Sequence, residues 1–404
     1  MAEPIGRDCL LFSTADWAAP YWTNKQHTAR LLAGRGWRVL YVESPGLRMP
    51  RPGSSRDWSR LARRLASGLA GLFGHIPSPE PNIFVYSPLV VPGLALPRWL
   101  RAFNRWSLAT PLRRFVRARR FDIPVVWTYH PFIFDALAGL STGPLIYHCV
   151  DDLAAVPFVD APAIETFERT LLERADAVFA TSKPLAEKCR SLNPNTHFLP
   201  NVADARHFGG AFEPGPLPAD LATIPAPRLG YHGVLSDYKL DFPLLLELFS
   251  ARPDWHLVLI GEEREGQSNP DLARLGALPN VYRLGYRPYA DLPAYLRGIQ
   301  VGLLPSALNA YTRAMFPMKF YEFLAAGIPV AATPLAFAAE PHPGLAVGAG
   351  PAGFAAAIAR QLARGRLTRQ ETLVAVGENT WGKRLDRMLA LAGLESAGRD
   401  EAAS

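Results

Sequence analysis

The segment from Pro317 to Gly327 combines residue types that could bind an anion. Proline is favoured at the first position of a helix, where its missing N–H costs nothing, so Pro317 predicts a helix start. The N–H groups of Met318 and Lys319 would then point out of the positive end of the helix dipole, where phosphate binds well. Lys319 adds a full positive charge, which is unfavourable at this end of a helix unless an anion neutralises it.

Glu322 follows Lys319 by three residues, which is about one helical turn. A carboxylate at this position can accept hydrogen bonds from sugar hydroxyls. Gly327 ends the predicted helix, and the apolar run that follows it predicts a buried strand. We therefore expect a phosphate group at the helix start and a sugar hydroxyl on Glu322. The alternative is an ordinary amphipathic helix that begins with proline.

A glycine loop, Gly230-Tyr-His-Gly233, follows another apolar strand. Glycine there lets a phosphate approach the backbone, so Gly233 is a candidate ligand-binding position. A Gly-x-x-Gly pattern alone is a weak signal, and the full G-x-G-x-x-G fingerprint is missing. This pattern argues against an NAD-dependent enzyme.

An adjacent carboxylate pair, Asp151 and Asp152, ends the strand that begins near Pro144. Two neighbouring carboxylates repel each other, which favours the protonated form of one and suits a general base near neutral pH. The alternative is that one of them caps the following turn, because aspartate is a favoured cap. His130 and His148 also stand at strand ends, where we expect hydrogen-bonded loop residues.

Strand-like and helix-like segments alternate along the whole chain, which predicts doubly wound parallel sheets. A segment rich in proline and glycine, residues 209–227, interrupts the alternation and reads as a linker. The predicted domains are residues 1–208 and 228–378, followed by a final helix and tail over 379–404.

The composition is that of a globular protein: 404 residues, 49% hydrophobic and 20% charged. This length suits two domains. Three scattered cysteines form neither a disulfide framework nor a zinc pattern, as expected in a reducing cytoplasm. The sequence predicts neither a signal peptide nor a membrane-spanning segment.

The formal net charge of +7 is concentrated in residues 48–120, which contain 14 arginines and only two acids. Two candidate amphipathic helices, over residues 58–73 and 99–120, carry tryptophan beside these arginines. Such helices are attracted to anionic bilayer surfaces, so we expect the region 48–120 to contact a membrane. Domain helices with solvated arginines are the main alternative. Nucleic acid is a weaker one, because no nucleic-acid motif accompanies the charge.

The run from Asn309 to Val330, with its Tyr-Glu-Phe-Leu-Ala-Ala-Gly segment, resembles the nucleotide-sugar site of GT-B glycosyltransferases. The resemblance is to the GT4-like (group 1) bacterial polysaccharide and teichuronic-acid-type enzymes. It implies a GT-B fold, in which two Rossmann-like domains face each other across a cleft, and a last helix that crosses back to the first domain. It also implies that Lys319 binds the donor diphosphate and Glu322 the ribose. Many members carry a further glutamate eight residues before this one, where Ala314 stands here, so the usual contact to the donor sugar is missing.

The same resemblance implies roles for residues outside this run. Lys239 matches a second basic ligand of the diphosphate, although a surface lysine is an equal alternative. Arg287 lies in the loop that holds the base or phosphate. The Pro-Met-Lys segment is also similar to that of the xanthan glucuronosyltransferase, in which the segment matching Asp151 supplies the proposed catalytic base. Asp-Asp-Leu is not the Asp-x-Asp metal motif of the other glycosyltransferase fold, so we expect no metal.

The resemblance thus implies a metal-independent hexosyltransferase that needs no cofactor besides its nucleoside diphosphate sugar. Its acceptor would be a lipid-linked saccharide in cell-surface polysaccharide synthesis. The expected location is cytoplasmic, peripheral on the inner face of the cell membrane. A nucleotide-sugar 2-epimerase of the same fold and a non-catalytic scaffold subunit that binds sugar nucleotides remain open as alternatives.

Overall fold

The computed structural model of the chain describes residues 7–44, 75–91, 96–157, 159–263 and 269–395. The basic helix expected over 58–73 lies outside the described residues. The chain forms two compact units: the first comprises Met1–Thr181, Leu185–Leu199 and Gly382–Ser404, and the second comprises Ser182–Pro184 and Pro200–Trp381. None of the described helices combines the length and apolar content that crossing a bilayer requires.

The first unit is built on a seven-stranded parallel sheet with the order β3-β2-β1-β4-β5-β6-β7. Its strands are short apolar runs, which is typical of parallel sheets covered on both faces. The strands are β1 (Asp8–Phe12), β2 (Arg38–Val42), β3 (Ile83–Tyr86), β4 (Val125–Thr128), β5 (Leu145–Cys149), β6 (Ala177–Ala180) and β7 (Thr196–Phe198).

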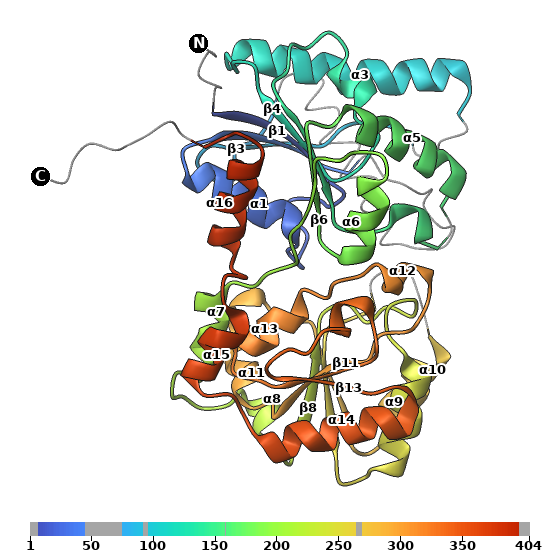
Figure 1. Cartoon of the computed structure of the whole chain (residues 1–404), viewed down its shortest axis with the longest axis vertical. Coiled ribbons are helices and arrows are strands. Elements are labelled where there is room, and N and C mark those ends of the chain that lie inside the picture. The colour runs from blue at the N-terminus through green and yellow to red at the C-terminus, as the bar shows by residue number, and fades with distance from the viewer. Residues whose placement is uncertain (1–6, 45–74, 92–95, 158, 264–268, 396–404) are drawn as a thin grey trace, which may run out of the picture. The chain divides into compact units, whose positions relative to one another are not determined.

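Helices cover both faces of this sheet (Figure 1). The helices of the first unit are α1 (Asn24–Gly34), α3 (Arg98–Ala118), α4 (Phe134–Leu137), α5 (Ala161–Arg174), α6 (Lys183–Arg190) and α16 (Trp381–Leu391). The last of these comes from the far end of the chain and lies beside α1 (Figure 1). Leu385 and Met388 of α16 share a buried cluster with Leu32 of α1. The C-terminal helix is therefore part of the first unit's core.

The second unit contains a six-stranded parallel sheet with the order β10-β9-β8-β11-β12-β13. In chain order this is the 3-2-1-4-5-6 arrangement of the Rossmann fold. Its strands are β8 (Arg228–His232), β9 (His256–Ile260), β10 (Val281–Gly285), β11 (Val301–Leu304), β12 (Val330–Ala332) and β13 (Leu345–Val347). The predicted fold class, two Rossmann-like parallel-sheet domains, is confirmed.

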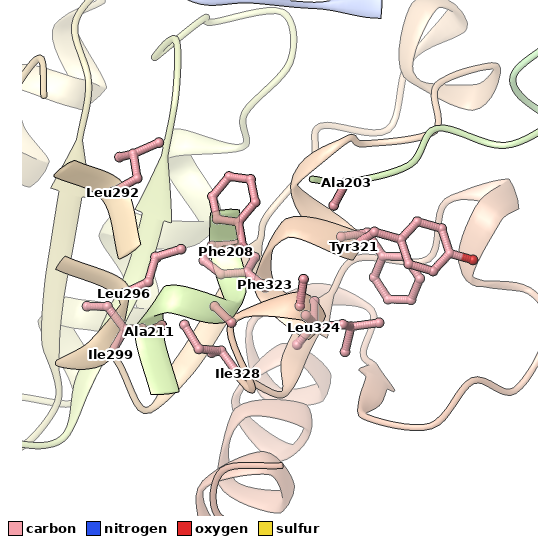
Figure 2. Close-up of a cluster of buried hydrophobic side chains, with 14 of the residues drawn as sticks. Ala203, Phe208, Ala211, Leu292, Leu296, Ile299, Tyr321, Phe323, Leu324 and Ile328 are labelled. Carbon is pink, nitrogen blue, oxygen red and sulfur yellow. The ribbon is translucent and has the colours of Figure 1, made fainter. Parts of the chain in front are cut away.

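One face of the second sheet is packed against a large apolar cluster that includes Phe208, Ile299, Phe323 and Ile328 (Figure 2). The helices of this unit are α7 (Ala205–Gly209), α8 (Ala219–Ala222), α9 (Phe242–Ala251), α10 (Pro270–Gly276), α11 (Leu292–Arg297), α12 (Ala310–Arg313), α13 (Lys319–Ala325), α14 (Gly350–Arg364) and α15 (Arg369–Val376).

The segment expected as a linker, residues 209–227, contains α8. Its Leu221 and Ile224 are almost fully buried in the same apolar cluster. The boundary between the units instead falls near Leu199 and Pro200. Proline and glycine break regular structure, but they do not by themselves keep a segment away from a core.

Candidate functional site

The strand order of the second unit reverses at β8, with β9 on one side and β11 on the other. Ligands of open α/β sheets bind beyond the carboxyl ends of the strands at such a point. Gly233 lies there, directly after β8, with a φ of 116° that favours glycine. Its N–H donates to the Ile260 carbonyl at 2.8 Å. A β-carbon at the neighbouring Gly261 would lie 1.8 Å from the Gly233 oxygen, so both positions need glycine.

Lys319 reaches this glycine from the start of α13. A β-carbon on residue 233 would lie 2.3 Å from Cε of Lys319 and 2.6 Å from its Nζ. The ammonium group is also 5.6 Å from the ring centroid of Tyr231. Burial lowers the pKa of Lys319, and the nearby Glu322 carboxylate opposes this effect. The structure thus brings two residues predicted from separate motifs, Gly233 and Lys319, into contact.

Glu322 is the third member of this group and is only 9% exposed. Burial raises the pKa of Glu322 to about 7, although the positive charge of Lys319 acts in the opposite direction. Its Oε2 lies 3.5 Å from Nε2 of His232, the last residue of β8. Burial and the charge of Lys319 hold the pKa of His232 well below its usual value, so the imidazole is neutral. A buried carboxylate, a lysine and a neutral histidine therefore converge at the end of β8.

The helix at this site begins slightly later than the sequence predicts. α13 starts at Lys319, Met318 takes the N-cap position, and Pro317 precedes it. The Pro317 carbonyl still accepts from the Phe320 N–H at 3.1 Å, so the turn begins with the proline. The Asn201 side chain donates to the Phe316 carbonyl at 2.6 Å and fixes the chain just before it.

The other two predicted donor ligands have different surroundings. The Lys239 ammonium lies beside a pair of aromatic rings, 5.2 Å from the centroid of Tyr238 and 5.5 Å from that of Tyr311. Arg287 is bound within the protein: its guanidinium contacts the Asp220 carboxylate at 2.6 Å and the Tyr295 hydroxyl at 2.6 Å. The predicted contact between Arg287 and a nucleotide would therefore compete with an existing ion pair.

In the first unit the two adjacent carboxylates have different partners. Asp152 makes an ion pair with Lys188 at 2.9 Å, and Lys188 also contacts the buried Glu168 at 2.8 Å. Asp151 instead lies 3.9 Å from the ammonium group of Lys25. Asp152 precedes a 3-10 turn, Leu153–Ala155, but its side chain forms no cap with that turn. Asp152 is therefore the carboxylate that pairs with Lys188, and Asp151 is the one that lies near Lys25.

A buried polar network lies behind Lys25. The Lys25 ammonium is 5.5 Å from the ring centroid of Tyr129, at the end of β4. The Tyr129 hydroxyl lies 3.1 Å from Nδ1 of His148, 2.9 Å from Oγ1 of Thr28 and 3.2 Å from the Asn24 carbonyl. Burial, together with the nearby positive charges, keeps the pKa of His148 well below its usual value. The start of α1 is thus tied to the ends of β4 and β5.

His130 was expected to be an ordinary hydrogen-bonded loop residue. Its Nδ1 accepts from the Phe132 N–H at 3.2 Å, which places the proton of the neutral ring on Nε2. That Nε2 is buried and has no hydrogen-bond partner among the described residues. Burial lowers the pKa of His130 to about 4, so the ring is neutral. The neutral ring therefore carries a buried N–H at the carboxyl edge of the first sheet.

Sequence reasoning missed His232 and Lys188 as parts of these groups, and also Arg384, whose positive charge acts on His148. His232 stands inside the glycine loop, so its position next to Gly233 was the available signal. Lys188 and Arg384 lie far along the chain from Asp151, and no local pattern connects them with it.

Comparison with known proteins agrees with this architecture. Residues 21–201 match the family model described as "Glycosyl transferase 4-like domain", and residues 226–364 match "Glycosyl transferases group 1". A putative teichuronic acid biosynthesis glycosyltransferase, TuaH of Bacillus subtilis (strain 168), is 30% identical over 218 residues. That alignment covers 50% of this chain and 53% of TuaH, so the chain spans about half the length of this relative.

Solved structures share the fold at low sequence identity. A sucrose-phosphate synthase from Thermosynechococcus elongatus is 18% identical, with a TM-score of 0.64 over 95% of this chain and 96% of its own. Anabaena HepE in complex with UDP-glucose is 14% identical, with a TM-score of 0.61 over 95% of this chain and 99% of HepE. Two Rossmann-like units, each matched by its own family model, show that the chain belongs to the group 1, GT4-like glycosyltransferases of the GT-B fold.

Proposed function

We propose that the protein transfers a sugar from a nucleoside diphosphate sugar to a saccharide acceptor in cell-surface polysaccharide synthesis. The observation that carries this proposal is the convergence of Gly233, Lys319 and Glu322 at the carboxyl end of β8. The family of the chain, the description of TuaH and the UDP-glucose complex of HepE support it.

The second unit would bind the donor. The backbone at Gly233 allows close approach of a phosphate, and Lys319 supplies a positive charge beside it. Glu322 would accept hydrogen bonds from the ribose hydroxyls, with Nε2 of His232 3.5 Å from one of its carboxylate oxygens. The N–H of Met318 would contact the same diphosphate, and Lys239 would supply a second cation. Arg287 would have to exchange part of its contact with Asp220 to reach the base.

The first unit would supply the base. In an inverting transfer, Asp151 takes the proton from an acceptor hydroxyl, and that oxygen forms a bond to the anomeric carbon of the donor sugar. The bond between this carbon and the diphosphate oxygen breaks, and its electron pair leaves with the diphosphate. Lys319 would stabilise the developing charge, an electrostatic role that the proposal assigns to this lysine rather than to a metal ion.

We further propose that the acceptor is lipid-linked and that the protein docks on the inner face of the cell membrane. Trp99 and Trp106 of α3 are 70% and 52% exposed, and Phe103 between them contacts Trp106. Arg101 and Arg105 on the same stretch of helix are also exposed. Exposed tryptophans beside arginines suit the interface of an anionic bilayer.

The direct test is to incubate the purified chain with labelled nucleoside diphosphate sugars, with and without bacterial membranes. Transfer of label to a lipid-extractable product that depends on membranes supports the proposal. A new nucleotide sugar formed without membranes would identify an epimerase. If the chain binds the donor but forms neither product, and if Asp151→Asn and Lys319→Ala leave its function in cells intact, it is a non-catalytic subunit.

A further inference from the structure

Arg384 is a buried arginine that reaches the acceptor-side network from the C-terminal helix α16. It is 5% exposed, and its guanidinium donates a short hydrogen bond to the side-chain oxygen of Asn24, the first residue of α1. Its positive charge acts on His148 together with that of Lys25. The last helix of the chain thus contributes a charged group to the surroundings of Lys25.

A series of contacts leads from Arg384 to Asp151. Arg384 holds the side chain of Asn24, whose carbonyl lies 3.2 Å from the Tyr129 hydroxyl. Lys25, the next residue, has its ammonium 5.5 Å from the Tyr129 ring centroid and 3.9 Å from Oδ2 of Asp151. The first turn of α1 is therefore fixed by α16 on one side and by β4 on another.

α16 does not depend on Arg384 for its attachment. Leu385, Met388 and Leu389 bury it in the apolar cluster of the first unit. Arg35 of α1 also contacts α16 twice, at the Gly382 carbonyl (3.1 Å) and at the Asp386 carboxylate (2.5 Å).

Burying the Arg384 guanidinium costs free energy, because the charge loses its contact with water. Burial lowers the pKa of Arg384 to about 10, which reflects the cost of keeping the charge inside the unit. Taking a charge out of water is expensive even when the charge is hydrogen-bonded, so a buried ionic contact is weak evidence for a role in stability. The position of Arg384 therefore suggests a role at the site rather than in holding the helix.

We propose that Arg384 is a positioning residue of the acceptor site: it fixes the first turn of α1 through Asn24 and so keeps the Lys25 ammonium against the Asp151 carboxylate. This inference rests on the proposed function in one respect, because an effect on transfer requires Asp151 to be the base. The anchoring of α1 by Arg384 does not depend on the proposed function. Arg384 would act on transfer without touching donor or acceptor.

The test compares Arg384→Met, Arg384→Lys and the matched control Arg387→Met, whose arginine is exposed on the same helix. We expect kcat to fall about tenfold or more in Arg384→Met, the size of a lost charged hydrogen bond, with the donor Kd nearly unchanged and the chain still folded. Arg384→Lys keeps a cationic donor near Asn24 and should recover most of kcat. Arg387→Met should behave as the wild type.

Hydrogen exchange on the full-length chain supplies a readout that needs no activity. Amides in the first turns of α1 should exchange about tenfold faster in Arg384→Met than in Arg387→Met. A wild-type kcat together with unchanged exchange in Arg384→Met would overturn the proposal, as would a loss of kcat that Arg384→Lys does not relieve. If Arg384→Met fails to fold, kcat and the amide exchange of α1 are measured in Arg384→Lys instead, and a change in neither would overturn the proposal. If the wild type transfers no sugar, the proposed function fails, while the exchange data still decide the anchoring.

Discussion

The side chain of Lys319 occupies the space in which residue 233 would carry a β-carbon: Cε lies 2.3 Å from that position. Gly233 directly follows β8 in the second unit, and Lys319 begins α13, 86 positions later in the numbering. The missing side chain therefore does two things. It permits a φ of 116°, and it leaves room for the lysine at the carboxyl end of β8.

Gly233→Ala should weaken nucleotide binding, because the new methyl group strains the backbone and must displace Lys319. We expect the Kd for a bound nucleoside diphosphate sugar, measured by calorimetry, to rise by about tenfold or more, the effect of losing a hydrogen bond to a charged group. Gly209→Ala is the control, since a β-carbon there meets nothing within 4 Å. Equal affinity of the two variants would show that the approach of Lys319 to Gly233 is not part of the site.

Removing the two lysines should have unequal effects. Lys319→Met takes away the buried cation next to Gly233, and we expect nucleoside diphosphate affinity to fall about 10- to 100-fold. Lys239→Met should lower it by only a few fold, because that ammonium lies against the rings of Tyr238 and Tyr311. Calorimetric titration of both variants with UDP measures the difference. A larger effect at Lys239 would reverse the assigned roles.

Donor binding should weaken below pH 7 because of Glu322. Its pKa is raised to about 7, and only the ionised carboxylate accepts hydrogen bonds from two ribose hydroxyls. Below pH 7 binding must first remove a proton, which costs about 1.4 kcal/mol per pH unit and raises the Kd towards tenfold per unit. UDP-glucose is a suitable ligand because its phosphates stay ionised over this range.

Glu322→Gln is the control for this pH dependence. It should bind UDP-glucose weakly at pH 7, with a Kd that changes little between pH 5.5 and 8. If the Gln variant keeps the wild-type slope, the titrating group is elsewhere.

The two neighbouring aspartates should respond differently to the same substitution. Asp151→Asn should reduce transfer by about 100-fold or more, the usual range for a lost general base, with donor affinity retained. Asp152→Asn should leave activity within a few fold of the wild type, because Lys188 still pairs with Glu168. Initial rates with labelled donor and membranes measure both. Full activity of Asp151→Asn would remove the catalytic assignment and favour a retaining reaction.

Membrane docking should depend on the exposed tryptophans of α3. The double variant Trp99→Ala/Trp106→Ala should lower the fraction of protein that floats with vesicles of anionic phosphatidylglycerol. Vesicles of pure phosphatidylcholine should bind less of the wild type and of each variant than the anionic vesicles do. Leu373→Ala/Val374→Ala removes comparably exposed apolar side chains, 68% and 65% exposed, from the second unit. Equal flotation of the two double variants would rule out α3 as the docking element.

Local patterns were sufficient for the parallel-sheet class. Buried apolar runs such as Cys9–Ser13 and Trp255–Ile260 alternate with helical segments, and each became a strand of a parallel sheet. β13 was not predicted, because its three residues lie between Gly344 and Gly348 and give no periodic signal. The linker prediction over 209–227 relied on composition, which does not report that Leu221 and Ile224 are buried.

By itself the sequence determined the Rossmann-like halves and the residue types of the proposed donor site, since Pro317, Lys319 and Glu322 are close in the chain and share one helix start. Only the tertiary structure decided which groups meet across long separations. In the second unit it placed Lys319 against Gly233 and paired Arg287 with Asp220. In the first unit it paired Asp152 with Lys188 and placed Asp151 near Lys25. It also brought Arg384 of the last helix to Asn24. The physical reason is that charge pairing and burial depend on distances in space. Strand order and helix packing set these distances, and the spacing of residues within a short segment predicts neither the strand order nor the packing.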